Sequence, residues 1–516
     1  MKKISHLLLA SLFFAALSCD KTPKEEPTPQ PVAPTAMTVS SSSVNVGVDG
    51  ETLTVEITAP AKPKFSKDAS WITITDGTFS SFKEKITVKV DANPTYEERT
   101  GTISLTCSPS SGGTLTASVT IKQSGKEKPK RPTPDGTPGW VMAEKLGFGF
   151  NLGNQMDAFA NGVADETAWT HVLATEKLFT SLKEKGIKTV RIPVTWLGHF
   201  GEAPEYKIDN RLDRVEELVG WAEKAGLNVI INMHHDGSES SYWLDIKKAS
   251  TDKALRDAIS AQVKAMWTQI AERFKDHGDL LIFESFNEIN DGQWGWSTDY
   301  RSPEGKKRQN DCLHEWNQAF VDAVRATGGN NATRWLGIPG YCADPGFSLE
   351  SLVLPTDSAE GRLMVGVHYY SPSDFTLNNT TKEWGHTRKT NLSDPNYDEK
   401  TMEETFSKMY DKWVAKGIPV YLGEFGCTMK ATASEKAFQK YYLEYLAKCA
   451  STYGMGGFIW DNCVEDVGRE CHGYVHHETG EWMGYAEEVF DVIKKAFYSD
   501  DSSYTLETVY DSAPKN

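Results

Sequence analysis

The chain has 516 residues, of which 39% are apolar, so it is long enough to form one large domain and at least one smaller one. Its formal net charge is −16 at neutral pH. Because binding to a phosphate backbone requires a basic face, this charge argues against a nucleic-acid partner.

The N-terminus has the pattern of an export signal. A basic start, Met1–Lys3, precedes an apolar stretch that is too short to span a bilayer, so residues 1–18 are predicted to be a signal peptide. Ala16–Cys19 resembles a bacterial lipoprotein box, which implies that a lipid on Cys19 anchors the protein at the outer membrane or cell surface. The alternative is an ordinary cleaved signal in which Cys19 has no role.

A small β-domain is predicted to follow. Residues 19–36 are rich in Pro and charge, which favours an extended tether, and residues 126–139 are predicted to be a second linker. Between them, residues 37–125 alternate apolar and polar positions, with turn residues at intervals that are typical of an immunoglobulin-like antiparallel β-sandwich. The predicted strands are Ser43–Val46, Leu53–Ile57, Trp71–Ile74, Ile86–Val90, Gly101–Leu105 and Ser118–Ile121.

The sandwich region resembles a known module. Its segments Ala69–Ile72, Asn93–Pro94, Glu98–Ile103 and Val119–Gly125 are similar to the BACON domain, which often precedes glycan-degrading catalytic domains. The resemblance leaves two roles open, a spacer or a sugar-binding module. Trp71 is the only Trp of the segment, and it suits a buried strand position as well as an exposed stacking surface. We favour the spacer.

Residues 140–500 alternate strand-like runs with amphipathic helices, and residues 501–516 are predicted to be a tail. One helix is predicted over Asp213–Ala225, with Asn210 as its N-cap and Gly226 as its stop signal. Eight nearly continuous apolar runs that alternate with helices predict an α/β TIM (β/α)8 barrel. The runs are Gly147–Asn154, Thr189–Trp196, Asn228–His235, Leu281–Glu288, Arg334–Gly340, Leu363–Tyr370, Ile418–Gly426 and Gly456–Asn462.

Two of these runs carry a glutamate near their end. Leu281–Glu288 reads LIFESFNE, and Val420–Gly426 reads VYLGEFG and places Glu424 in an equivalent position. Active-site groups of such barrels lie at the C-terminal strand ends, so the two carboxyls should meet there. A carboxyl pair is the usual means of cutting a glycosidic bond, which makes a glycoside hydrolase the main hypothesis. A surface glycan-binding protein with an inactive site is the alternative.

The polar residues of the strand ends closely resemble glycoside hydrolase family 5, over nearly all of the chain from Trp140 to about Tyr498. The motifs NLGN, INMHHDG and VHYYSP are similar to subfamily 4 endoglucanases, whose activities include cleavage of cellulose, xyloglucan and mixed-linkage β-glucan. Ile289 stands after Glu288 where the family commonly has Pro.

The resemblance implies a role for each strand-end residue. Glu424 would be the nucleophile and Glu288 the acid/base of a retaining mechanism, with the carboxyls roughly 5 to 5.5 Å apart. We expect Arg191 to lower the pKa of Glu424, and the charge of Glu424 to raise the pKa of Glu288. Asn287 would bind the sugar 2-hydroxyl, and Tyr370 would orient Glu424. The implied substrate-binding residues are Asn154, Arg191, His234, His235, Asn287, Trp294, His368, Tyr370 and Trp460, and Trp243 and Trp296 could line further subsites.

The implied activity is endo-acting hydrolysis of β-1,4-glucan by a monomer that needs no cofactor and no metal. A mannanase or xylanase on the same barrel remains an alternative, because strand-end carboxyls do not encode the configuration of the sugar. Seven cysteines besides Cys19 show no CxxC spacing, which argues against a zinc site or a redox pair. The histidines of residues 466–477 are predicted to lie in a solvated surface loop rather than a metal site.

Overall fold

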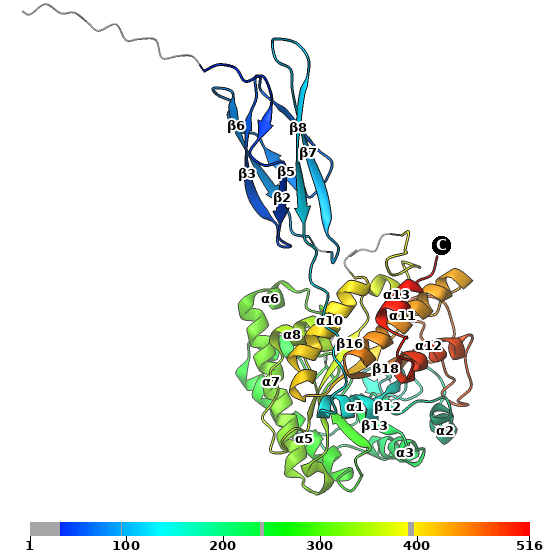
Figure 1. The fold of residues 1–516 in the computed structure, drawn as a ribbon. Helices are drawn as coiled ribbons and strands as arrows, with labels where there is room; N and C mark the ends of the chain where they lie inside the picture. The colour runs from blue at the N-terminus through cyan, green and yellow to red at the C-terminus, as the bar shows by residue number, and fades with distance from the viewer. Residues whose placement is uncertain (1–30, 94, 238–241, 391–396, 516) are drawn as a thin grey trace, which may run out of the picture. The chain divides into compact units, whose positions relative to one another are not determined.

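The computed structural model describes residues 31–93, 95–237, 242–390 and 397–515 (Figure 1). The chain divides into two compact units, one ending at Lys128 and the other beginning at Pro129. Within the described ranges, no helix combines the length and the apolar character needed to cross a membrane. The seven cysteines in these ranges are free thiols, and Cys19 lies outside them.

The N-terminal unit is a β-sandwich of two four-stranded sheets, with strand orders β1-β3-β6-β5 and β2-β8-β7-β4. The predicted antiparallel sandwich is confirmed, although one strand pair, β2 and β8, runs parallel. Alternating burial does not encode strand direction, and the short strands β1 and β4 carried too little pattern to be predicted. The strands are β1 Thr38–Val39, β2 Ser43–Val46, β3 Glu51–Thr58, β4 Lys64–Lys67, β5 Ile72–Thr75, β6 Lys83–Val90, β7 Arg99–Cys107 and β8 Leu115–Gln123.

Trp71 packs within the sandwich. The guanidinium of Arg99 lies 4.3 Å from the centre of its ring, and the ring contacts the apolar core. The backbone of Gly101 is so close that an added Cβ would lie 3.0 Å from the indole. These contacts occupy the ring, which favours a structural role for Trp71 over sugar stacking.

The C-terminal unit confirms the predicted TIM barrel. Eight parallel strands close in the order β12-β13-β14-β15-β16-β17-β18-β9, and helices surround them (Figure 1). The prediction placed the ends of β12, β13 and β14 four residues too late, because it extended each run into the loop that follows the strand. The strands are β9 Phe148–Leu152, β12 Thr189–Ile192, β13 Asn228–Ile231, β14 Leu281–Glu284, β15 Leu336–Pro339, β16 Leu363–Tyr369, β17 Val420–Phe425 and β18 Met455–Asp461.

The helices follow the strands as their sequences suggest. Helix α3 is preceded by Asn210, and Gly226 just after it adopts the left-handed conformation of a stop signal, with φ +73°. A hairpin of β10 (Phe159–Ala160) and β11 (Val163–Ala164) follows β9. The helices are α1 Pro138–Leu146, α2 Glu176–Glu184, α3 Arg211–Lys224, α4 Ile246–Ala249, α5 Lys253–Arg273, α6 Thr298–Arg301, α7 Pro303–Ala326, α8 Pro345–Ser351, α9 Ser373–Thr376, α10 Glu399–Lys412, α11 Ala433–Thr452, α12 Ala486–Tyr498 and α13 Leu506–Asp511.

Helix α1 closes the end of the barrel at which the strands begin. The carbonyl of Leu146 accepts a 2.7 Å hydrogen bond from the hydroxyl of Thr189, the first residue of β12. The carbonyl of Lys145 accepts one from the side chain of Asn228, the first residue of β13. Met142 and Leu146 pack against inward-facing strand side chains. With this end closed, the opposite end is left for a site.

Parts of the predicted linker and tail are attached to the barrel. Nε of Arg131 donates to Oε1 of Glu403 at 2.7 Å, and its Nη1 forms an ion pair with Glu507 of α13. Helix α13 lies within the predicted tail, and its Leu506 and Val509 are buried. The chain from Arg131 onward is therefore tied to the barrel, ahead of the predicted linker end at residue 139.

Candidate active site

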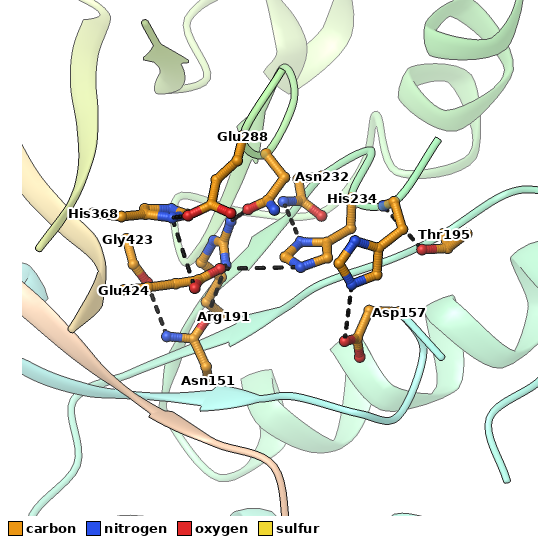
Figure 2. A network of polar contacts seen from close by, with 12 residues as sticks. Asn151, Asp157, Arg191, Thr195, Asn232, His234, Glu288, His368, Gly423 and Glu424 are labelled. Carbon is orange, nitrogen blue, oxygen red and sulfur yellow. Dashed lines mark hydrogen bonds and ion pairs between the residues drawn. The ribbon is translucent and has the colours of Figure 1, made fainter. Parts of the chain in front are cut away.

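Glu288 and Glu424 meet at the C-terminal end of the barrel (Figure 2). Glu424 lies in β17, whereas Glu288 lies four residues beyond the end of β14. One oxygen of each carboxyl and one ring nitrogen of His368 all lie within 4.8 Å of one another. This separation fits a retaining glycosidase, because inverting enzymes hold their carboxyls roughly 6.5 to 9.5 Å apart.

Arg191 is the centre of a buried polar network beneath the two carboxyls. Its Nη1 donates to Oε1 of Glu424 at 2.8 Å and to Oδ1 of Asn151 at 2.9 Å. Its Nη2 donates to Oδ1 of Asn287 at 2.8 Å and to Oε1 of Glu284 at 2.7 Å. The guanidinium is fully buried, so these bonds fix its position and that of Glu424.

Glu284 is a member of this network that the sequence analysis missed. It also accepts hydrogen bonds from the hydroxyl of Tyr421 at 2.7 Å and from Nδ2 of Asn232 at 2.9 Å. Burial opposes its ionisation, but the charge and hydrogen bonds of Arg191 hold its pKa below the ordinary value. The signal was available in LIFESFNE, where a charged residue sits inside an otherwise apolar strand.

The second oxygen of Glu424 faces two other side chains. Oε2 accepts a 3.0 Å hydrogen bond from the hydroxyl of Tyr370 and lies 3.6 Å from Nδ1 of His368. Burial raises the pKa of Glu424 above its ordinary value, although His368 and Arg191 both act to lower it. The expected contribution of Arg191, which lowers the pKa of Glu424, is confirmed, but burial outweighs it.

Glu288 has a higher affinity for a proton than Glu424 has. Burial raises the pKa of its carboxyl to about 8, with smaller contributions from Asp344, Glu284 and Glu470. The expected rise of the pKa is confirmed, but its largest cause is burial rather than the charge of Glu424. Its Oε1 lies 2.7 Å from Nδ1 of His368, whose own pKa burial lowers to about 4. A neutral histidine thus contacts a carboxyl that holds its proton at neutral pH.

A row of rings begins beside Oε1 of Glu424 with His234 (Figure 2). Nε2 of His234 lies 4.0 Å from Oε1 of Glu424, and its ring stacks on Trp460 with centres 5.9 Å apart. His235 comes next, and its ring centre lies 4.4 Å from that of His234. Its Nε2 lies 3.8 Å from Oδ2 of the buried Asp157, whose pKa burial raises to about 7.

The remaining predicted residues are Asn154 and three tryptophans. Asn154 follows β9, and its N–H donates to Asp157. Trp294 and Trp296 lie in the loop after β14 and are 42% and 71% exposed, so both rings could meet a ligand. Trp243 instead donates a 3.0 Å hydrogen bond from Nε1 to Asp236 and packs on the core, which makes it a structural residue.

Among the residues that the structure describes, two groups of side chains have spacings that could hold a cation. They are Asp157 with His234 and His235, and Glu288 with His368 and Glu424. Both flank the buried guanidinium of Arg191, whose positive charge opposes a metal ion there.

The histidines near residue 470 were wrongly placed in a solvated loop. His472 and His477 are fully buried, and Nε2 of His477 lies 3.1 Å from Oδ1 of the buried Asp461. The backbone N–H groups of Tyr474 and Val475 also donate to Asp461 at the end of β18, and these contacts are not encoded by the local sequence.

The geometry agrees with comparisons to known proteins. Residues 152–466 match the model of cellulase, glycosyl hydrolase family 5. The chain belongs to this family. Residues 41–124 match the BACON model, a putative N-terminal binding domain. The family assignment makes the protein a glycoside hydrolase.

Individual relatives resemble most of the chain. Endoglucanase A of Paenibacillus barcinonensis is 36% identical over 62% of this chain and 82% of the relative. A xyloglucan-specific endo-β-1,4-glucanase of Bacteroides ovatus is 30% identical over 80% of this chain and 83% of the relative's length. The structure of a broad-specificity endoglucanase from Bacteroides salanitronis is 51% identical, with a TM-score of 0.68 over 72% of this chain and 97% of that one.

Proposed function

We propose that this glycoside hydrolase is a retaining endo-β-1,4-glucanase that uses Glu424 as nucleophile and Glu288 as acid/base. The observation that carries the assignment is the close carboxyl pair in two different environments. Glu424 accepts hydrogen bonds from Arg191 and Tyr370, which stabilise its ionised form. Burial keeps the proton on Glu288 by raising its pKa to about 8. The names of the relatives support a β-glucan as substrate.

The reaction proceeds in two balanced steps. Glu288 donates its proton to the glycosidic oxygen while a carboxylate oxygen of Glu424 attacks the anomeric carbon, so the bond to the leaving chain breaks and a glycosyl ester forms. Glu288, now ionised, then takes a proton from a water molecule whose oxygen displaces Glu424. The sugar leaves with its original configuration, and Glu288 is again protonated.

Loss of the Glu424 charge in the ester changes the second step. The ester removes one nearby negative charge while the cation of Arg191, which favours ionisation of Glu288, stays in place, so the surroundings of Glu288 become more positive. This lowers the pKa of Glu288 at the stage at which it must act as a base. Asn287, held by Arg191 through Oδ1, has its amide NH₂ group available for a sugar hydroxyl.

The roles can be tested with Glu424→Ala, Glu288→Ala and azide. Glu424→Ala should lose turnover on every substrate, whereas Glu288→Ala should retain activity on aryl glycosides whose leaving group needs no proton, since acid assistance is worth about 10² to 10⁴-fold. Azide should give a β-glycosyl azide with Glu288→Ala and an α-glycosyl azide with Glu424→Ala. The reverse pattern of products would exchange the two roles.

The substrate can be tested on a polysaccharide panel. We expect soluble β-glucans, such as xyloglucan and mixed-linkage glucan, to be cut faster than crystalline cellulose, with a steep early fall in viscosity and a ladder of oligosaccharides. Faster cleavage of mannan or xylan than of every glucan would make the protein a mannanase or xylanase. Absence of reducing ends from every polysaccharide would indicate a binding protein.

We also propose that the protein is a monomer anchored to the bacterial outer membrane or cell surface through Cys19, on the strength of the lipoprotein-like box Ala16–Cys19. Fatty-acid labelling of the wild type, and its loss together with release from the membrane fraction in Cys19→Ala, would support this. Equal membrane association of both would contradict it, and light scattering would give the oligomeric state.

A further inference from the structure

An aromatic cluster stands at the rim outside the residues assigned so far. The ring of Phe159 lies 5.2 Å from Trp169 and 5.6 Å from Tyr242, measured between centres. Both Phe159 and Trp169 also contact His235, at 5.9 and 5.7 Å. None of the three aromatic residues belongs to the apolar core that fills the barrel unit, and Trp169 is 38% exposed. Core packing therefore does not account for them.

The segment that carries Trp169 is held in place. The carboxylate of Glu166 accepts hydrogen bonds from Nε and Nη2 of Arg214, each at 2.8 Å. Nε2 of Gln155, which follows β9, donates to the hydroxyl of Thr170 at 2.7 Å. The indole next to Thr170 is thus presented by a fixed loop, as a preorganised binding surface requires.

The position of the aromatic cluster relative to Glu288 and Glu424 indicates on which side of the cleaved bond it lies. Oε2 of Glu424 lies near His368, which contacts Glu288. Oε1 lies near His234, which leads to His235 and then to Trp169. The proton donor marks the side on which the leaving chain departs. The cluster therefore lies on the other side, toward the part of the substrate that becomes bound to the nucleophile.

We propose that Trp169, supported by Phe159, is a stacking surface for a glucosyl unit on the non-reducing side, at least two units beyond the one that contacts Trp460. A β-1,4-linked glucosyl ring exposes C–H groups on its faces, and these can cover the exposed part of an indole and remove apolar surface from water. The inference rests on the proposed β-glucanase activity. It names Trp169 as a determinant of preference for longer chains.

The test uses 2-chloro-4-nitrophenyl β-cellobioside, β-cellotrioside and β-cellotetraoside, which share a leaving group and differ only on the non-reducing side. In the wild type, kcat/KM should rise with length. In Trp169→Ala we expect this rise to shrink by about tenfold, mainly through KM, with little change on the cellobioside. Trp169→Phe should restore part of it. Leu173→Ala is the matched control, because Leu173 is a 52% exposed apolar residue of the same segment.

Three results would overturn the proposal. They are an unchanged length dependence in Trp169→Ala, an equal loss on all three substrates with a lowered unfolding temperature, and a wild type with no gain beyond the cellobioside. A wild type that cleaves none of the aryl glycosides and no β-glucan would instead contradict the proposed function, so the two failures can be told apart.

Discussion

The sandwich and the barrel differ in whether they bury ion pairs. The described ion pairs of the sandwich, such as Lys85–Glu56, lie in solvent with side chains 70% and 59% exposed. In the barrel, Arg191 and Glu284 pair at 0% and 1% exposure. Burying two charges removes them from water at a cost that their attraction only partly offsets, and apolar residues could fill such a space as stably. The buried pair of the barrel is therefore explained by what it does to Glu424, whereas the described ion pairs of the sandwich are all exposed.

The largest effect should come from removing the central charge of the barrel. Arg191→Met leaves Glu284 and Glu424 buried without their cation, so we expect the free energy of unfolding to fall by about 3 to 5 kcal/mol. The pKa of Glu424 should rise further, which moves the acidic limb of the kcat/KM profile to higher pH. Urea unfolding and pH–rate profiles measure both effects.

Arg191→Lys sharpens this test. Lysine keeps the charge but cannot reproduce the planar set of donors that reaches four partners, so we expect stability to recover more than activity. If Arg191→Met matched the wild type in stability and in its acidic limb, the network would not have the role given to it.

The pH dependence should be smaller but specific to Glu288. Its pKa of about 8 in the folded protein lies above the ordinary 4.5, so its contribution to stability is complete below about pH 4.5 and is lost as the pH rises through about 8. The difference in unfolding temperature between Glu288→Gln and the wild type should therefore shift in favour of the variant from pH 5 to pH 8. A constant difference over this range would contradict the raised pKa. The alkaline limb of wild-type kcat/KM should lie near pH 8.

A smaller effect is expected where the chain enters the barrel. Arg131 is partly exposed, with 29% of its side chain accessible, but its partner Glu403 is buried. Arg131→Ala should lower the free energy of unfolding of residues 129–516 by roughly 1 to 3 kcal/mol, because a buried carboxylate loses its cation. The double variant Arg131→Ala/Glu403→Gln should recover part of this loss. A chain that starts at Trp140 should then melt below one that starts at Pro129, and equal melting would show that Arg131 contributes nothing.

The smallest effect is expected from removing the sandwich. Deletion of residues 31–128 should leave kcat/KM on soluble oligosaccharides within about twofold, because the described catalytic network lies entirely in the unit that begins at Pro129. A tenfold or larger loss would mean that the sandwich takes part in the cleft. It would also break the contrast drawn between the two units.

Prediction from sequence succeeded where a pattern is local and repeated. Eight apolar runs gave the barrel, and strand-end position brought Glu288, Glu424 and Arg191 together. Prediction failed where several distant segments set the outcome. Burial from every side, rather than the neighbouring carboxylate, dominates the pKa of Glu288, and His472 is buried by chain that its own sequence does not reveal.

The sequence by itself determined the order of domains, the barrel class and the pair of glutamates, because apolar periodicity and residue type at strand ends are properties of short segments. Only the tertiary structure decided that Glu284 completes the Arg191 network, that Trp243 is structural, and that Trp169 lies partly exposed beside Phe159 and His235. Each of these depends on contacts between residues far apart in the chain. Closure of the barrel creates those contacts, and no local pattern records them.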